Sequence, residues 1–219
     1  MGEPRYGLLV FDWDGTLVDS TGAIVGSILG ASRDMGLPEA DPAKARYSIG
    51  LGMEDALRMA VPTLPAARYR EFAAYYRKHF VLQEDRMAVF EGMPELLVEL
   101  RCAGYLIAIA TGKSRRGLDR ALSGTGLGEY FVTSRCADET SPKPHPAMLH
   151  ELMDELAQSP SRTLMIGDTS HDMQMAENAG VDGVAVSYGA HSQETLNACR
   201  VRACVSSVQQ LQSWLKTNA

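Results

Sequence analysis

Acidic residues stand where apolar runs end, and they are the residues best suited to chemistry. Asp12 and Asp14 follow the run at residues 6–11. Asp168 follows the run at residues 163–166. Side chains two residues apart on an extended segment point the same way, so the first pair would act on one ligand. Neighbouring carboxylates divide labour, one as ionised nucleophile and one as protonated general acid. A turn that leads into a helix N-cap is the alternative reading of the pair.

A fourth acid extends this pattern. Asp172 lies four residues after Asp168, one helical turn further on. This spacing suits one direct and one supporting ligand of a hard, oxygen-seeking cation such as Mg²⁺. Alternatively, Asp172 only complements the dipole of the helix. We expect His171 on the surface rather than on a metal, because Mg²⁺ prefers oxygen ligands.

Two further positions are suited to holding an anion. Thr111 ends another apolar run, and Gly112 follows it. A hydroxyl with free backbone N–H groups at a helix start makes an anion site, although an ordinary N-cap fits Thr111 equally well. Lys143 stands between Pro142 and Pro144, which stiffen the backbone around one cation. A solvated loop lysine is the alternative for that position.

The elements that must position these residues alternate between strands and helices. Short apolar runs, typical of strands buried on both faces, occur at 6–11, 105–110, 163–166, 183–186 and 202–205. Helical patterns lie between them, so the sequence predicts an α/β core with a parallel sheet covered on both faces. The carboxyl ends of parallel strands share one edge, where ligands bind. That edge would bring Asp12, Asp14, Thr111 and Asp168 into one cleft. Burying these carboxylates together is costly unless a cation neutralises them.

Residues 19–87 break this alternation with helical patterns only. An aromatic stripe at 69, 72, 76 and 80 has helical spacing and is expected to form a core. We therefore predict that residues 19–87 form a small helical domain, inserted into an α/β core made of residues 1–18 and 88–219.

Composition limits the possible partners. The net charge of −6 and the pI of 5.4 argue against a nucleic-acid-binding surface. The longest apolar run is too short to span a bilayer, and no basic segment followed by an apolar stretch opens the chain. The four cysteines have no metal-ligand spacing and are expected to be free thiols in a reducing compartment. We expect a cytoplasmic monomer or weak homodimer that binds neither nucleic acid nor membrane.

Taken together, these motifs resemble the haloacid dehalogenase-like (HAD) superfamily, and within it the phosphoglycolate phosphatase-like branch. The resemblance covers essentially the whole chain. Its motifs occur in order: Asp12-Trp13-Asp14-Gly15-Thr16-Leu17, Thr111 after an apolar strand, Lys143, and Gly167-Asp168 with Asp172. The resemblance implies a Rossmann-like parallel-sheet core with an inserted small helical cap.

The resemblance also implies roles for these residues. Asp12 would attack phosphorus and become an aspartyl phosphate, while Asp14 would protonate the leaving alcohol and then deprotonate water. Mg²⁺ would be held by the side chains of Asp12 and Asp168 and the carbonyl of Asp14, with Asp172 as a further or supporting ligand. Thr111, with Gly112, and Lys143 would hold phosphate oxygens. Such a cation is also expected on physical grounds. Without it, each carboxylate would repel each unit of phosphate charge by about 4 kcal/mol when the two charges are about 4 Å apart near a protein surface.

Specificity is expected from the cap, since the core motifs address only the phosphoryl group. The loop at 47–53 resembles the substrate-facing cap loop of the family, so Gly50 and Gly52 are expected to line the cleft; a simple turn is the alternative. Arg46 and Arg58 are expected to be solvated. The predicted substrate is a small phosphate ester. A phosphosugar mutase, a pyrophosphatase and a non-catalytic binding module remain alternatives, and Thr16 favours the phosphatase over the mutase because mutases of this branch commonly have Val there.

Overall fold

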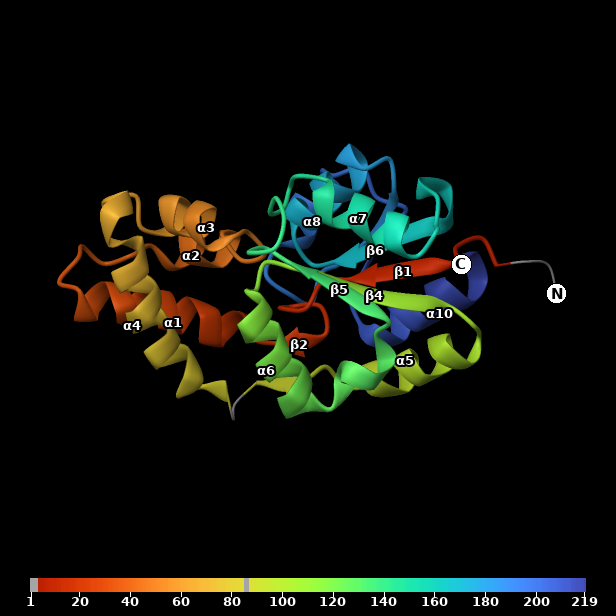
Figure 1. The fold of residues 1–219 in the computed structure, drawn as a ribbon, viewed down its shortest axis with the longest axis horizontal. Coiled ribbons are helices and arrows are strands. Elements are labelled where there is room, and N and C mark those ends of the chain that lie inside the picture. Colours follow the sequence, from red (N-terminus) through yellow and green to blue (C-terminus); the bar gives the residue numbers. More distant parts are fainter. Residues whose placement is uncertain (1–3, 85–86) are drawn as a thin grey trace.

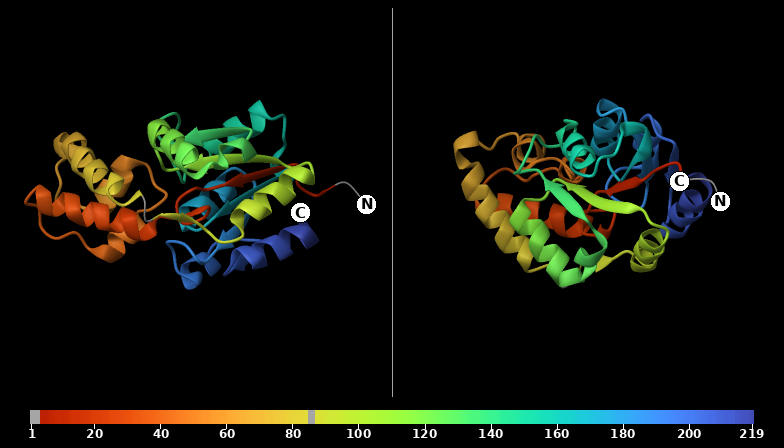
Figure 2. Two further views of the ribbon diagram at one scale, coloured as in Figure 1. Left: turned by 90° about the horizontal axis from the view of Figure 1, so that it is seen from below. Right: turned by 45° about the vertical axis from the view of Figure 1, so that its right-hand side comes forward.

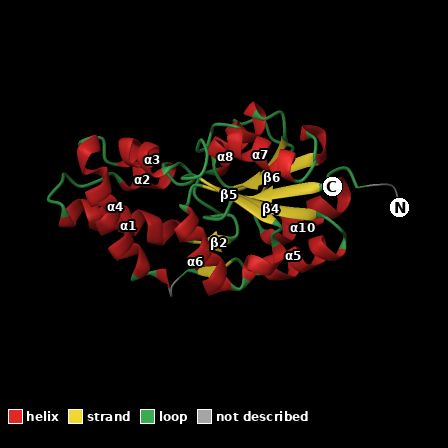
Figure 3. Ribbon diagram, viewed as in Figure 1, coloured by secondary structure: helices red, strands yellow, loops and turns green. Residues whose placement is uncertain are grey.

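A six-stranded parallel sheet forms the centre of the protein (Figures 1 and 3). The computed structural model describes residues 4–84 and 87–219. The strands lie in the order β5-β4-β1-β6-β7-β8, and each neighbouring pair is parallel. Their bounds are β1 (Leu8–Phe11), β4 (Leu106–Thr111), β5 (Thr133–Cys136), β6 (Thr163–Gly167), β7 (Asp182–Val186) and β8 (Ala203–Val205). The predicted α/β fold with a parallel sheet is confirmed.

One strand of this sheet was not predicted. Each of the five apolar runs contains a strand, but β5 has the sequence Thr133-Ser134-Arg135-Cys136 and no apolar run. It lies at the edge of the sheet and pairs only with β4. An edge strand is covered less completely than a central one, so its side chains need not be apolar.

Helices cover both faces of the sheet (Figure 2). Leu9 and Phe11 of β1 are buried in a cluster with side chains of α5 (Met93–Cys102), α6 (Arg115–Thr125) and α10 (Val208–Asn218). Leu8 and Val10 point to the other face, where the covering helices are α7 (Ala147–Glu155), α8 (Ser170–Asn178) and α9 (Gln193–Asn197). Because alternate residues of one strand face opposite layers, a central strand has to be apolar throughout.

Four helices pack apart from the sheet, around a third buried cluster (Figure 1, left). They are α1 (Thr21–Asp34), α2 (Pro42–Tyr47), α3 (Met53–Ala60) and α4 (Tyr69–Val81). Phe72 and Phe80 of the aromatic stripe are buried in this cluster. A two-stranded antiparallel ribbon of β2 (Val18–Asp19) and β3 (Ala88–Val89) joins the bundle to the sheet. The predicted domain boundaries lie in this ribbon, and the division into two domains stays a prediction.

The helices and the cysteines bear on the membrane and thiol predictions, respectively. Within residues 4–84 and 87–219, no helix combines the length and the apolar character that a membrane span requires. The cysteines at 102, 136, 199 and 204 are free thiols, and only Cys136 is buried.

Candidate active site

Three strand ends meet at one edge of the sheet and carry the predicted site residues. β1 lies between β4 and β6, so the residues that follow Phe11 stand beside the ends of both neighbours. The N–H of Asp12 continues the sheet ladder by donating to the carbonyl of Ile166 at 2.9 Å. Thr111 ends β4, and Asp168 follows β6 directly. The sheet order therefore brings residues far apart in the sequence to one place, as the sequence analysis expected.

Lys143 is buried at the centre of this edge. Its Nζ lies 2.7 Å from Oδ1 of Asp12 and 2.6 Å from Oδ1 of Asp172, and the lysine side chain is fully buried. Burial lowers the pKa of Lys143, but the charges of the two carboxylates outweigh it and the net pKa is raised. Lys143 is therefore a buried cation, and the alternative of a solvated loop lysine is wrong.

Asp12 presents one free oxygen to the site. Its Oδ1 accepts from Lys143, whereas its Oδ2 is buried and has no hydrogen-bond partner among the described residues. Burial raises the pKa of this carboxyl to about 7, and the charges of Asp172 and Asp14 add to the rise while Lys143 opposes it. A buried oxygen without a partner is costly unless a ligand contacts it.

Asp168 is enclosed on all sides. Its Oδ1 accepts from the Thr16 hydroxyl at 2.9 Å, and its Oδ2 accepts from the N–H of Ala190 at 2.6 Å. Gly15 and Gly189 pack so closely that a Cβ on either would lie 2.1 Å or 2.2 Å from Oδ2. Burial raises the pKa of Asp168, and the nearby carboxylates raise it further. The enclosure fixes the direction of this carboxylate.

Asp172 combines two functions. Thr169 and Asp172 form a capping box at the start of α8, in which Oδ2 of Asp172 accepts from the Thr169 N–H at 3.0 Å and from its hydroxyl at 2.6 Å. The other oxygen accepts from Lys143. Asp172 therefore stands in the first turn of the helix, as its helix-dipole alternative requires, and it also contacts the central lysine directly.

Asp14 lies beside this cluster and has different partners. Its Oδ1 accepts from the Ser20 hydroxyl at 2.6 Å and lies 2.9 Å from Nζ of Lys113. Trp13, between the two acids, is buried in the core below the sheet, which agrees with the predicted alternation. The turn of the alternative reading is present at residues 15–17, but Ser20 makes no side-chain cap hydrogen bond at the start of α1.

The carboxylates at this edge fit a hard divalent cation. One oxygen each from Asp12, Asp168 and Asp172 lies within 4.8 Å of the others. When ionised, these three acids and Lys143 carry a formal charge of −2, which a divalent cation would balance. This donor set consists of carboxylate oxygens alone, which suits Mg²⁺. His171 is not part of this group: its ring bonds the carbonyl of Tyr47 at 2.9 Å. The residue is buried, so its predicted surface position is wrong.

The predicted anion-binding residues lie under the cap loop. Thr111 is buried, and its hydroxyl accepts from the N–H of Lys113 at 3.2 Å. The N-cap of α6 is Ser114, so the alternative that Thr111 only caps a helix is wrong. A Cβ on Gly112 would lie 2.6 Å from the carbonyl oxygen of Gly50. Backbone of the loop at 47–53 therefore packs directly on the loop after β4.

Gly50 and Gly52 lie where the loop at 47–53 packs on the α/β core. Gly50 has a left-handed φ of 90°, and a Cβ there would lie 3.2 Å from the hydroxyl of Thr169. A Cβ on Gly52 would lie 2.9 Å from Pro142, next to the central lysine. The two glycines thus allow the cap loop to approach two loops of the core, and their contact with a substrate stays a prediction.

Several residues of the site were missed from the sequence. Lys113 contacts Asp14, and its Nζ lies 4.9 Å from the centre of the Phe80 ring in the cap. Its position two residues after a strand end was a usable signal. The loop at 189–191, which bonds Asp168, follows β7 and reaches the same edge. Arg46 is exposed, as expected, and its guanidinium also donates hydrogen bonds to two carbonyls of that loop. Arg58 pairs with Asp55 on an exposed face.

Comparisons with known proteins agree with this geometry. The family model described as "Haloacid dehalogenase-like hydrolase" matches residues 9–186. The chain is 35% identical to "Probable phosphatase IndB" of Dickeya dadantii over 210 residues, covering 93% of this chain and 91% of the relative. It is 30% identical to "Pyrophosphatase PpaX" of Bacillus velezensis, covering 90% and 91%. It is 31% identical to the phosphoglycolate phosphatase of Pectobacterium atrosepticum, covering 86% and 83%.

Proposed function

The chain belongs to the haloacid dehalogenase-like hydrolases, and on that premise we propose that it is a Mg²⁺-dependent phosphatase of small phosphomonoesters that works through an aspartyl phosphate on Asp12. The proposal depends on one observation: the two oxygens of the Asp12 carboxylate have different surroundings. One oxygen is held by Lys143, and the other is buried at the edge of the sheet with no hydrogen-bond partner in the described part of the chain. This is the arrangement that a carboxylate nucleophile needs, because its attacking oxygen must be oriented and unengaged.

In the first step, Oδ2 of Asp12 attacks phosphorus while the bond to the leaving oxygen breaks. Asp14 gives its proton to that oxygen, and the alcohol departs. In the second step Asp14 takes a proton from water, whose oxygen attacks phosphorus. The acyl phosphate bond breaks, inorganic phosphate leaves and the Asp12 carboxylate is restored. Ser20 and Lys113 hold Asp14 in place for both proton transfers.

Positioning and charge neutralisation supply most of the catalysis in phosphoryl transfer. We propose that the side chains of Asp12 and Asp168 and the carbonyl of Asp14 hold Mg²⁺, with Asp172 in support. When bound, Mg²⁺ offsets the charge of the phosphoryl oxygens. Thr111 and Gly112 offer a hydroxyl and an N–H to the phosphate, and Lys143 adds a buried cation. Asp168 is held rigid by Thr16 and Ala190.

Lys113 supports a substrate that carries a second negative group. Its ammonium lies beside Asp14, where the leaving group departs, and beneath Phe80 of the cap. Tyr76 stacks on Phe80 with ring centres 5.6 Å apart, so the cap side of this region is aromatic. We propose a small ester whose carboxylate meets Lys113. Phosphoglycolate has this chemistry, and a phosphoglycolate phosphatase is among the relatives.

Pyrophosphate is the second candidate substrate, and one observation favours it. A pyrophosphatase is among the relatives of similar identity, and the leaving phosphate would bring its charge to Lys113. A dehalogenase is disfavoured because it has no use for the acid Asp14. A phosphosugar mutase is disfavoured by Thr16, as the sequence analysis argued. Its hydroxyl is bound to Asp168.

A phosphate-release screen tests the proposal. The substrates are phosphoglycolate, pyrophosphate, a sugar phosphate, a nucleoside monophosphate and an aryl phosphate, each with Mg²⁺ and with EDTA. We expect Mg²⁺-dependent release, fastest from a substrate with a second negative group. Conversion of one sugar phosphate into another without phosphate release would support the mutase instead. No turnover of any substrate would support a non-catalytic binding module.

We further propose that residues 19–87 act as a cap that opens and closes over the strand ends. Closure would exclude water from the leaving group, and the ribbon of β2 and β3 is the natural hinge. The free cysteines suit a reducing compartment, so we also propose a cytoplasmic protein, as a monomer or weak homodimer. Light scattering in solution tests the oligomeric state.

A further inference from the structure

The loop of residues 189–191 lies between the cap and Asp168. It follows β7, and its Gly189 packs against the carboxylate so closely that a Cβ would lie 2.2 Å from Oδ2 of Asp168 and 2.4 Å from the carbonyl oxygen of Gly15. The N–H of His191 also donates to the carbonyl of Asp168 at 3.3 Å. The loop therefore cannot shift without disturbing the enclosure of that carboxylate.

One peptide unit of this loop is bonded at both ends. Its N–H, on Ala190, donates to Oδ2 of Asp168 at 2.6 Å. Its C=O, on Gly189, accepts from Nη2 of Arg46 at 2.7 Å. A cation at the carbonyl polarises the peptide and strengthens the donation from its N–H. Arg46 is thus linked to the carboxylate of Asp168 through a single peptide group.

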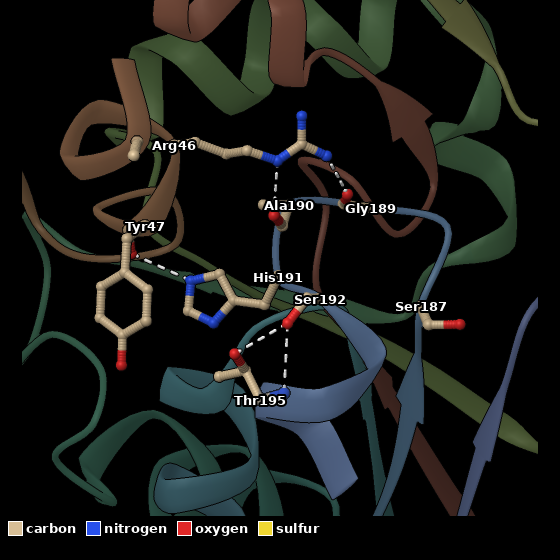
Figure 4. A pocket seen from close by; sticks show the side chains of 9 residues that line it. Arg46, Tyr47, Ser187, Gly189, Ala190, His191, Ser192 and Thr195 are labelled. Carbon is tan, nitrogen blue, oxygen red and sulfur yellow. Dashed lines mark hydrogen bonds between the residues drawn. The ribbon is translucent and has the colours of Figure 1, made fainter. Parts of the chain in front are cut away.

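Arg46 binds the loop of residues 189–191 through two hydrogen-bond donors (Figure 4). Besides the bond to Gly189, its Nε donates to the carbonyl of Ala190 at 2.7 Å. Within the part of the chain that the structure describes, no other donor bonds either carbonyl. A cavity of about 360 Å³ lies on this side of the loop, lined by polar residues such as Ser187, Ser192 and Thr195. On this side, the loop of residues 189–191 is therefore held by Arg46 rather than by packed side chains.

The neighbouring residue fixes the same part of the cap. The carbonyl of Tyr47 accepts from Nε2 of His171 at 2.9 Å and from Nε2 of His191 at 3.0 Å. Nδ1 of His191 accepts from the N–H of Ser170 at 3.0 Å, which places the proton of the neutral ring on Nε2. The Tyr47 ring also stacks on His191, with ring centres 4.4 Å apart (Figure 4). The end of α2 is therefore docked on the core at two adjacent positions.

We propose that Arg46 is a positioning residue that couples the closed cap to the carboxylate of Asp168, through the peptide between Gly189 and Ala190. This inference rests on the proposed function, because it assigns Asp168 to the Mg²⁺ site. With the cap closed, Arg46 holds the loop so that the Ala190 N–H fixes Oδ2. With the cap open, the arginine leaves and the carboxylate gains freedom to rotate. Cap closure then tightens Mg²⁺ binding, and by reciprocity Mg²⁺ favours closure.

Mg²⁺ binding to Arg46→Gln and Arg46→Lys tests this coupling. The dissociation constant is measured by titration calorimetry, and the rise in unfolding temperature with Mg²⁺ provides a second readout. Losing a hydrogen-bond partner of a metal ligand commonly weakens binding by about 10- to 100-fold. Arg46 is one hydrogen bond further from the metal ligand, because it contacts Asp168 only through a peptide group. We therefore expect Arg46→Gln to bind Mg²⁺ about 5- to 10-fold more weakly than the wild type. Lysine keeps the charge but cannot reach two carbonyls in one plane, so Arg46→Lys should be intermediate.

Arg58→Gln is the matched control, because Arg58 is also a cap arginine but pairs with exposed Asp55. It should bind Mg²⁺ like the wild type. At saturating Mg²⁺, the KM of Arg46→Gln should stay within about twofold, since Nε and Nη2 of Arg46 bond loop carbonyls rather than a group of the proposed site. Unchanged Mg²⁺ affinity in Arg46→Gln, or an equal loss in Arg58→Gln, would overturn the coupling while the proposed function stands. If the wild type binds no Mg²⁺ and turns over without it, both proposals are wrong.

Discussion

Lys143 and Asp12 form a buried ion pair in which one oxygen of the carboxylate is held at 2.7 Å and the other has no partner among the described residues. The lysine restricts rotation of the carboxylate and partly offsets the cost of burying its charge. It also holds Asp172 on the opposite side, at 2.6 Å. One cation thereby orients two acids, and this relationship leads to the first two predictions.

Asp12→Asn should abolish turnover and preserve the fold. The amide keeps the shape of the side chain but is a very poor nucleophile, so we expect kcat for phosphate release to fall by about 10⁴-fold or more. Circular dichroism should show an unchanged fold. Asp19→Asn is the control, because Asp19 is exposed and close in sequence. Substantial activity in Asp12→Asn would remove Asp12 from the role of nucleophile.

Lys143→Met should destabilise the protein in a pH-dependent manner. Without the lysine, buried Asp12 and Asp172 lose their counter-charge, and the free energy of unfolding should fall by about 3–5 kcal/mol at pH 8. The pKa of Asp12 is already raised to about 7 by burial, and loss of Lys143 raises it further. At pH 5 Asp12 is therefore protonated, and the loss should be smaller. Urea unfolding at both pH values, with exposed Lys44→Met as control, measures this. A loss below 1 kcal/mol at pH 8 would contradict the prediction.

The stabilising effect of Mg²⁺ should grow between pH 5 and pH 8. Because burial raises the pKa of Asp12 to about 7, this carboxyl binds a proton more strongly in the native state than in the unfolded chain between about pH 4 and that value. The contribution of Asp12 to the stability of the metal-free protein therefore falls as pH rises through this window. Mg²⁺ binds the ionised acids, so it should restore more stability at higher pH. Thermal unfolding with and without Mg²⁺ measures the effect, which Asp168→Ala should largely remove. A shift that is independent of pH would count against these ligands.

Gly112→Ala should impair the docking of the cap loop. The added Cβ would lie 2.6 Å from the carbonyl oxygen of Gly50 and 2.7 Å from that of Leu51, and backbone atoms cannot move aside cheaply. We expect kcat/KM to fall by about tenfold because the cap closes incompletely. Gly124→Ala is the matched control, since a Cβ there meets nothing within 4 Å. Equal activity of the two variants would show that the loop does not close on Gly112 during turnover.

Lys113→Met should change the choice of substrate. The proposed carboxylate of the substrate loses its partner, so kcat/KM for phosphoglycolate should fall about tenfold more than kcat/KM for an aryl phosphate. Both values should fall to some extent, because Lys113 also holds Asp14. The neighbouring Arg116→Met, at an exposed position, should affect neither substrate. An equal loss for the two substrates would leave Lys113 as a partner of Asp14 only.

The part of the site that could be predicted from sequence depends on buried strands. β1, β4 and β6 are apolar on both faces, so their runs and the polar residues after them stand out in the sequence. Asp12, Thr111 and Asp168 follow from the rule that parallel strands end at one edge. Lys143 has no strand to mark it. It entered the prediction through its two prolines and the family resemblance, and only the structure shows that it contacts two acids.

The remaining site residues depend on contacts that no local pattern records. Arg46 is exposed and His171 is buried, but hydrogen bonds to backbone carbonyls hold both side chains, and nothing in the sequence indicates these contacts. β5 was missed because an edge strand needs no apolar run. Gly189 gives no signal in sequence, since its importance comes from its close packing against Asp168.

The order of the sheet also has a consequence for how the chain folds. β1 is synthesised first, yet its two partners begin only at Leu106 and Thr163. This fully apolar strand therefore stays unpaired until most of the chain has been synthesised. During that time both of its edges are exposed and can aggregate. The helical bundle, whose helices lie between Thr21 and Val81, is made during that interval. We expect the bundle to form before the sheet. The proposed cap would then be folded before the active site that it covers.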